Sequence, residues 1–189
     1  MVYTRINMNK ITAKEGNVIT KPFKNLEQSK QKRIIDVALK EFAEKGFDQA
    51  STNEIVKNAG IGKGMLFYYF KSKQGLYFYL IDYAIDIMTQ EFLNHVDIQE
   101  SDFIERLRMI GQVKTKYYYE YPNVNNFLSS VYLNEEVELS SDLSTRLAGL
   151  VKQGYAMTFE NIDKTLLRND LDTDKAFQLI RLLFDGYHN

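Results

Sequence analysis

The chain of 189 residues contains no cysteine and no tryptophan, and it has only two prolines and two histidines. Without cysteine, disulfide bridges, thiolate metal ligands and thiol nucleophiles are excluded. The two histidines, His95 and His188, stand far apart in the sequence, so they do not support a metal site or an acid–base pair. A Gly-x-x-x-x-Gly-Lys-Ser/Thr phosphate loop is also missing. We therefore predict a protein that is not an enzyme and that holds no metal or other cofactor.

Long apolar runs are missing as well, since no stretch approaches the ~18 residues that cross a bilayer. The first residues are polar and lack the apolar centre of a secretion signal. Hydrophobic residues make up 44% of the chain, which is ordinary for a folded protein with a sizeable core. These features predict a cytoplasmic protein without a membrane segment.

Charge is divided unevenly along the chain, although the net charge is only −1. Residues 1–73 contain 14 basic and 7 acidic side chains, a net charge of +7, whereas residues 74–189 contain 10 and 18, a net charge of −8. A basic part attracts phosphate groups and would bind nucleic acid in a salt-dependent manner. Charge alone leaves a second interpretation open, in which the basic part is only a solvated surface.

A helical pattern begins after residue 25, where apolar residues recur at three- and four-residue steps from Ile34 to Phe42. This spacing places them on one side of a helix. Gly46 is expected to end that helix, because glycine adopts the left-handed backbone of a helix terminus. Residues 1–24 lack this periodicity, and we predict a flexible basic arm there, which either lies along DNA or is a disordered tail.

Two short helices are predicted next. Ser51 and Glu54 have the spacing of a capping box, which marks the start of the first. A tight turn, Gly60-Ile61-Gly62, separates it from the second, which covers 63–70. A supporting helix followed by two short helices around a glycine turn is typical of a helix-turn-helix. In that motif the second short helix enters the major groove of DNA.

Several residues of this unit suit contacts with DNA. Thr52 stands at a helix start, where a hydroxyl and free backbone N–H groups favour a phosphate. Lys63 can reach guanine acceptors, and Gly64 lets the backbone approach the bases closely. The short helix has more aromatic residues than its inward side needs, although these rings could instead pack against the following helix. The candidates are Thr52, Lys63, Gly64, Met65, Phe67, Tyr68, Tyr69 and Lys73.

Residues 34–76 resemble the N-terminal domain of the TetR family of repressors. The resemblance is carried by Ala38, Phe42, Gly46, Phe47, Thr52, Ile55, Ala59, Gly60, Ile61, Lys63, Gly64, Leu66, Phe67, Tyr68, Tyr69, Phe70, Lys73 and Leu76. It implies DNA contacts by Thr52, Lys63, Gly64, Tyr68 and Lys73. Two positions depart from the family pattern. Gly62 replaces a serine and removes a helix cap, and Phe67 replaces a tyrosine and removes a hydroxyl.

The rest of the chain is predicted to form further helices, over 73–95, 101–120, 124–133, 142–167 and from 173 to the end. Pro122 is expected to end one of them, and Thr173 to cap the last. By the resemblance, the last two helices of each copy form the interface of a homodimer. Their apolar candidates, which could instead pack inside one copy, are Leu143, Leu147, Leu150, Val151, Leu166, Leu179, Leu182, Leu183 and Phe184.

Aromatic residues and methionines are frequent in the middle helices. Any one of them is an ordinary core residue, but together, and with the resemblance, they favour a pocket for a small apolar or aromatic molecule. The candidates are Met88, Phe92, Phe103, Tyr117, Tyr118, Tyr121, Phe127, Tyr132 and Phe159.

These interpretations combine into one prediction. The fold is all-α, with a three-helix N-terminal helix-turn-helix domain at 25–72 joined by a long helix to a helical ligand-binding and dimerisation domain at 73–189. The predicted function is a DNA-binding transcriptional regulator. We expect a repressor that a small-molecule inducer releases from a palindromic, double-stranded DNA operator. A transcriptional activator of the same fold, or an interaction protein that no longer binds DNA, is the alternative.

Overall fold

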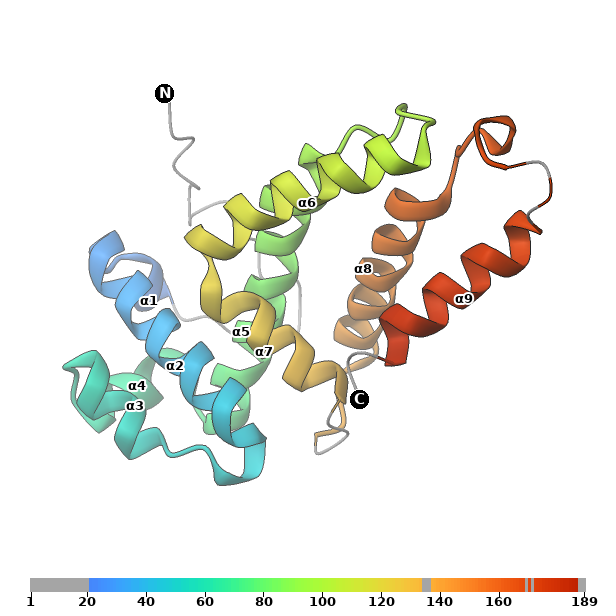
Figure 1. Ribbon diagram of the computed structural model, residues 1–189. Coiled ribbons are helices and arrows are strands. Elements are labelled where there is room, and N and C mark those ends of the chain that lie inside the picture. The colour runs from blue at the N-terminus through green and yellow to red at the C-terminus, as the bar shows by residue number, and fades with distance from the viewer. Residues whose placement is uncertain (1–20, 134–136, 169, 171, 187–189) are drawn as a thin grey trace.

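The computed structural model describes residues 21–133, 137–168, 170 and 172–186, whose helices are drawn in Figure 1. Every regular element in those ranges is helical, which confirms the predicted all-α fold. Within the described ranges, no helix is both long and apolar enough to cross a membrane. Figure 1 shows the first four helices gathered at one end of the molecule and the last two, α8 and α9, at the opposite end.

The N-terminal end consists of α1 (Lys21–Lys24), α2 (Gln28–Gln49), α3 (Thr52–Ala59) and α4 (Lys63–Phe70). The bounds of α4 agree with the predicted second short helix. Helix α2 is kinked at Gly46, whose φ of 69° lies in the left-handed region that glycine tolerates. The predicted interruption is therefore confirmed, although helical structure resumes as far as Gln49.

Helix α1 differs from the flexible arm predicted for residues 1–24. Residues 1–20 lie outside the described part of the chain. The next four are helical, and the side chain of Phe23 is only 1% exposed. Its ring centroid lies 4.8 Å from that of Phe70 and 5.6 Å from that of Tyr79. The described end of the arm is thus packed against α4 and the helix that follows it.

A long helical stretch runs from the helix-turn-helix into the body, as predicted for 73–95. It begins as an α-helix, passes through a π-helical turn (η2) and ends in a 3₁₀ turn (η3). The elements of the body are α5 (Lys73–Ile87), η2 (Met88–Phe92), η3 (Leu93–His95), α6 (Phe103–Glu120), α7 (Pro122–Leu133), α8 (Ser141–Phe159), η4 (Lys164–Leu166) and α9 (Thr173–Gly186).

Several details at the helix ends differ from the sequence prediction. Helix α8 was expected to reach residue 167 but ends at Phe159, because Glu160 is extended and Asn161 has a φ of 59°. Helix α6 ends at Glu120, just before Pro122, as predicted. Helix α7 begins at Pro122 itself, two residues earlier than predicted, where the missing N–H group of proline costs no hydrogen bond. At the start of α9, Asp172 accepts a hydrogen bond from the backbone N–H of Lys175, so the capping side chain comes one residue before Thr173.

The N-terminal end and the body share one core. Phe42 of α2 contacts Tyr77 of α5 and Phe127 of α7, with ring centroids 5.0 and 6.4 Å away, and Tyr77 and Phe127 are 5.4 Å apart. All three side chains are buried. A shift of α5 or α7 would therefore act directly on the helix that supports α3 and α4.

Candidate functional site

Local backbone bonds fix the turn between α3 and α4. The side chain of Ser51 accepts a hydrogen bond from the N–H of Glu54, which confirms this half of the predicted capping box. At the other end of α3, Gly60 has a φ of 65°, and its N–H donates to the carbonyls of Lys57 and Val56. The chain can reverse here because glycine carries no Cβ to clash in that conformation. Glycine at this position therefore sets the angle between the two short helices.

Glu41 fixes the start of α3 from the supporting helix. Its Oε1 accepts hydrogen bonds from the backbone N–H of Ser51 and from Nζ of Lys45, both at 2.9 Å. Burial alone would raise the pKa of this carboxyl, but these two bonds hold the pKa below its usual value. Glu41 thus takes the place that a capping box gives to Glu54, and it ties α2 to α3.

Helix α4 turns one side into the core and presents another to solvent. Leu66, Tyr69 and Phe70 are buried, with at most 4% of their surface exposed. Tyr68 is 55% exposed. The remaining DNA-contact candidates at the starts of α3 and α4 are outside the core: Lys63 and Gly64 are exposed, and Thr52, Met65 and Phe67 are half-buried.

Two further candidates are engaged within the protein. The ring of Tyr69 is buried with its centroid 5.6 Å from that of Phe23, so the structure does not place it on the outer side of α4. The Nζ of Lys73 donates to the carbonyl of Asp48 at 3.0 Å and lies 4.9 Å from the ring centroid of Phe47. Lys73 therefore ties the start of α5 to the end of α2, and a phosphate contact by this side chain stays a prediction.

Glycine is required where α4 passes into α5. A Cβ on Gly75 would overlap the backbone carbonyl oxygen of Phe70, which cannot move without shifting α4. We expect the Gly75→Ala variant to lose about 1–3 kcal/mol of unfolding free energy, measured by urea denaturation. Gly64→Ala is the matched control, because nothing lies within 4 Å of its added Cβ. Equal stability of the two variants would show that this turn has room to relax.

The predicted ligand residues fall into separate groups. One is an aromatic cluster of Phe92, Tyr118 and Tyr121 around Tyr117, whose ring centroid lies 5.7 to 5.9 Å from the other three. The hydroxyl of Tyr117 is buried and lacks a hydrogen-bond partner among the described residues. Burial raises the pKa of Tyr121 to about 12, so its hydroxyl stays protonated at neutral pH. Met88 is partly buried at the edge of the core.

The remaining ligand candidates lie elsewhere. Phe127 belongs to the shared core with Phe42. Phe103 and Phe159 stack on each other at 6.0 Å and contact Phe177 of α9. Tyr132 is 62% exposed. The structure therefore does not bring these residues together with the cluster around Tyr117.

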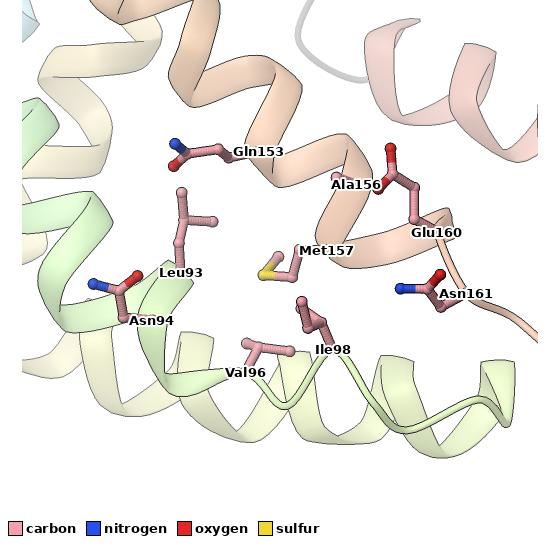
Figure 2. Close-up of a pocket in the computed structure, with 9 residues that line it drawn as sticks. All are labelled: Leu93, Asn94, Val96, Ile98, Gln153, Ala156, Met157, Glu160 and Asn161. Carbon is pink, nitrogen blue, oxygen red and sulfur yellow. The ribbon is translucent and has the colours of Figure 1, made fainter.

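A cavity of about 400 Å³ lies between η3 and the C-terminal end of α8. Figure 2 shows the apolar side chains of Leu93, Val96, Ile98 and Met157 directed towards this space. Ala156 completes the apolar lining, and the polar lining residues are Asn94, Gln153, Glu160 and Asn161. Among the described residues that line the cavity, none is a ligand candidate predicted from the sequence; its methionine, Met157, was not one of them.

One buried guanidinium holds the two walls of this cavity together. Arg106 of α6 has no exposed surface. Its Nη1 donates to the carbonyls of Met157 at 2.7 Å and Glu160 at 3.4 Å. Its Nη2 donates to the carbonyl of Ile98 at 2.7 Å and to that of Glu100. The carbonyls at the end of α8 are the negative end of that helix, so a cation is favoured there.

A second arginine joins α8 to α5. The guanidinium of Arg146 contacts Asp82 through Nη1, and its Nη2 lies 2.6 Å from a carboxylate oxygen of Asp86. Asp82 has only 7% of its side chain exposed. Separating this pair is costly, because it would leave a buried carboxylate without a compensating charge. Arg146 and the cavity lie on the same two helical stretches, so movement at either place acts on α5.

Comparison with known proteins agrees with this architecture. Residues 34–80 match the family model described as bacterial regulatory proteins, tetR family. A solved TetR family transcriptional regulator from Chloroflexus aurantiacus is 31% identical, with a TM-score of 0.62, over 87% of this chain and 76% of that one. The regulator FadR from Bacillus subtilis, solved in complex with stearoyl-CoA, is 25% identical, with a TM-score of 0.50, over 83% and 84% of the two chains.

Curated relatives match only part of this chain. The HTH-type transcriptional regulator YuxN of Bacillus subtilis is 40% identical over 67 residues, which are 35% of this chain and 23% of that protein. The chain thus spans less than half the length of the first curated relatives that it matches. These relatives are described as HTH-type transcriptional regulators, and the Chloroflexus structure covers most of this chain.

Proposed function

The chain belongs to the TetR family of transcriptional regulators, and from this premise we propose that it is a repressor that binds a palindromic DNA operator as a homodimer. It would act in the cytoplasm, without enzymatic activity, and a small apolar molecule would release it from DNA. The proposed units are a helix-turn-helix domain at 25–72 and a ligand-binding and dimerisation domain at 73–189.

The observation that carries the DNA-binding proposal is the two-sided arrangement of α4. Its buried side chains anchor the helix, while Lys63, Gly64 and Tyr68 are exposed. Lys63 and Gly64 begin the helix, which is where recognition helices contact base edges. The lysine offers donors for guanine, and the glycine leaves space for close approach. Thr52, Met65 and Phe67 are half-buried and would add contacts to phosphates, sugars and thymine methyl groups.

Exposed apolar side chains on the last two helical regions support the proposed homodimer. Val151 of α8 is 49% exposed, and Leu179 and Leu182 of α9 are 62% and 58% exposed. In contrast, Leu143 is buried in the core of its own chain. The side chains of Leu183 and Phe184 lie outside those the structure describes. A second copy covering this surface would place two helix-turn-helix units on one palindrome, about 34–36 Å apart.

Release by a ligand is the second part of the proposal. The solved FadR relative holds stearoyl-CoA, which supports a ligand site in the body of this chain. A ligand acts only through its different affinity for the two states of the dimer. A difference of ~2.7 kcal/mol would lower operator affinity about a hundredfold. The link to DNA is α5, which begins beside α4 and leads to η3 at the cavity.

Replacing Lys63 tests the DNA-binding proposal. We expect Lys63→Ala to weaken binding to the protein's own upstream DNA at least tenfold, because a base or phosphate contact is lost. The measurement is a fluorescence titration at two salt concentrations. Lys116→Ala is the matched control, since Lys116 is also an exposed lysine but lies on α6, outside the helix-turn-helix. Equal affinity of the two variants would show that α4 does not contact DNA through Lys63.

A further inference from the structure

The lining of the η3–α8 cavity is aliphatic rather than aromatic. Leu93, Val96 and Ile98 form one wall, and Ala156 and Met157 form the other. Flexible aliphatic and thioether side chains pack well against a chain of methylene groups. They offer no ring on which an aromatic ligand could stack. The volume of about 400 Å³ lies in the range of small-molecule sites. The walls therefore suit an alkyl chain.

The polar rim of the cavity favours an uncharged head group. Among the described residues of the rim, Asn94, Gln153 and Asn161 carry amides, and Glu160 carries the one carboxylate. Figure 2 shows Asn94 and Gln153 at one end of the cavity and Glu160 and Asn161 at the other. Amides both donate and accept hydrogen bonds, so they match a hydroxyl or amide. Among the described residues that line the cavity none is basic, so an anionic head would lack a partner.

The buried cation behind the walls does not change this charge balance. Both terminal nitrogens of Arg106 donate to backbone carbonyls, three of which belong to the lining residues Ile98, Met157 and Glu160. The guanidinium itself is fully buried and does not line the cavity. Its hydrogen bonds connect the loop at Ile98 to the C-terminal end of α8.

We propose that this cavity binds a single-chain aliphatic molecule with an uncharged, hydrogen-bonding head, such as a medium- or long-chain alcohol. The inference rests on the proposed function, because it names the site and the chemical class of the releasing ligand. A chain lying between Leu93 and Met157 pushes η3 away from α8. The displacement passes along η2 to α5, whose first residue, Lys73, is bonded to the helix that supports α3.

Calorimetric titration of the full chain with decanol, decanoate and decyltrimethylammonium tests the head group. Decanol is expected to bind tightest, because the rim hydrogen-bonds an uncharged head and holds no basic side chain. Octanol is expected to bind roughly fifteenfold more weakly than decanol, since two fewer methylene groups are buried. Tighter binding of decanoate or decyltrimethylammonium overturns the assignment of an uncharged head, and no binding of decanol overturns the proposal.

Two lining variants locate the site. Ala156→Phe fills the cavity and should weaken decanol binding at least tenfold, while Ala148→Phe, at an exposed alanine on the same helix, should leave it unchanged. Gln153→Phe is a second blocking variant at an exposed lining position, in case Ala156→Phe fails to fold. Unchanged affinity in a folded blocking variant shows that decanol binds elsewhere.

The DNA titration separates this inference from the proposed function. If upstream DNA is bound but decanol is not, the ligand class is wrong and the DNA-binding function stands. If decanol binds at the cavity and leaves DNA affinity unchanged, the site is confirmed and release by this ligand is wrong. Loss of both would contradict the inference and the proposed function together.

Discussion

The Arg106→Met variant is expected to lose about 3 kcal/mol of unfolding free energy, measured by urea denaturation. Methionine fills much of the same space but cannot donate hydrogen bonds. The carbonyls of Ile98, Met157 and Glu160 would then lose a buried donor, at a cost of roughly 1–3 kcal/mol for each one that water does not reach. The loss is expected to be large because one side chain joins α6 to two other segments, the loop at Ile98 and the C-terminal end of α8.

Arg108 provides the control for this prediction. It lies two residues further along α6, its side chain is 56% exposed, and it pairs only with the exposed Glu105 among the described residues. Arg108→Met should change stability by less than about 0.5 kcal/mol. Arg106→Lys should fall between the wild type and Arg106→Met, because one ammonium cannot bridge both walls as a planar fork does. Wild-type stability of Arg106→Met would show that the guanidinium holds nothing together.

The second large effect is expected at the link between α5 and α8. Arg146→Met leaves Asp82, 7% exposed, and Asp86, 22% exposed, without a basic partner among the described residues. Removing one partner of a buried ion pair costs several kcal/mol, and the 28% exposure of Arg146 places the expected loss at about 2–3 kcal/mol. A double-mutant cycle with Asp82→Asn should show strongly non-additive losses. Additive losses would contradict a direct interaction.

The stability deficit of Arg146→Met should depend on pH. Burial raises the pKa of Asp86 above its ordinary value of 3.8, and the contact with Arg146 opposes this shift. In the variant only burial remains. When folding raises the pKa of an acid, the folded protein loses stability as the pH rises from the unfolded-state pKa to the folded-state pKa. The deficit should therefore be greatest at neutral pH and shrink towards pH 3.8, and a deficit that grows on acidification would contradict this account.

The helix-turn-helix could be predicted from the sequence because its signals are local. A cap at Ser51, a left-handed glycine at Gly60 and the apolar spacing of α2 each act within a few residues. The anchor at Phe23 could not be predicted in the same way. It is a single aromatic residue in a polar, lysine-rich segment, and only its contacts with α4 and α5 explain its burial.

The residues around the cavity carried little sequence signal. They come from two segments separated by the whole of α6 and α7, so no local spacing in the sequence links them. Arg106 resembled any solvent-facing arginine of an amphipathic helix, since the sequence does not reveal the carbonyls that it meets. Aromatic residues were easier to notice, yet most of them serve as core, as Phe127 does.

In the proposed function, the exposed side of α4 reads a specific DNA sequence. The direct measurement is a titration of the wild-type protein against its own upstream duplex and against a scrambled duplex, each at two salt concentrations. We predict that the upstream duplex binds at least about a thousandfold more tightly. We also expect both affinities to fall as salt rises, because phosphate contacts release counterions. Equal affinity for the two duplexes, or no binding to either at low salt, would contradict the claim.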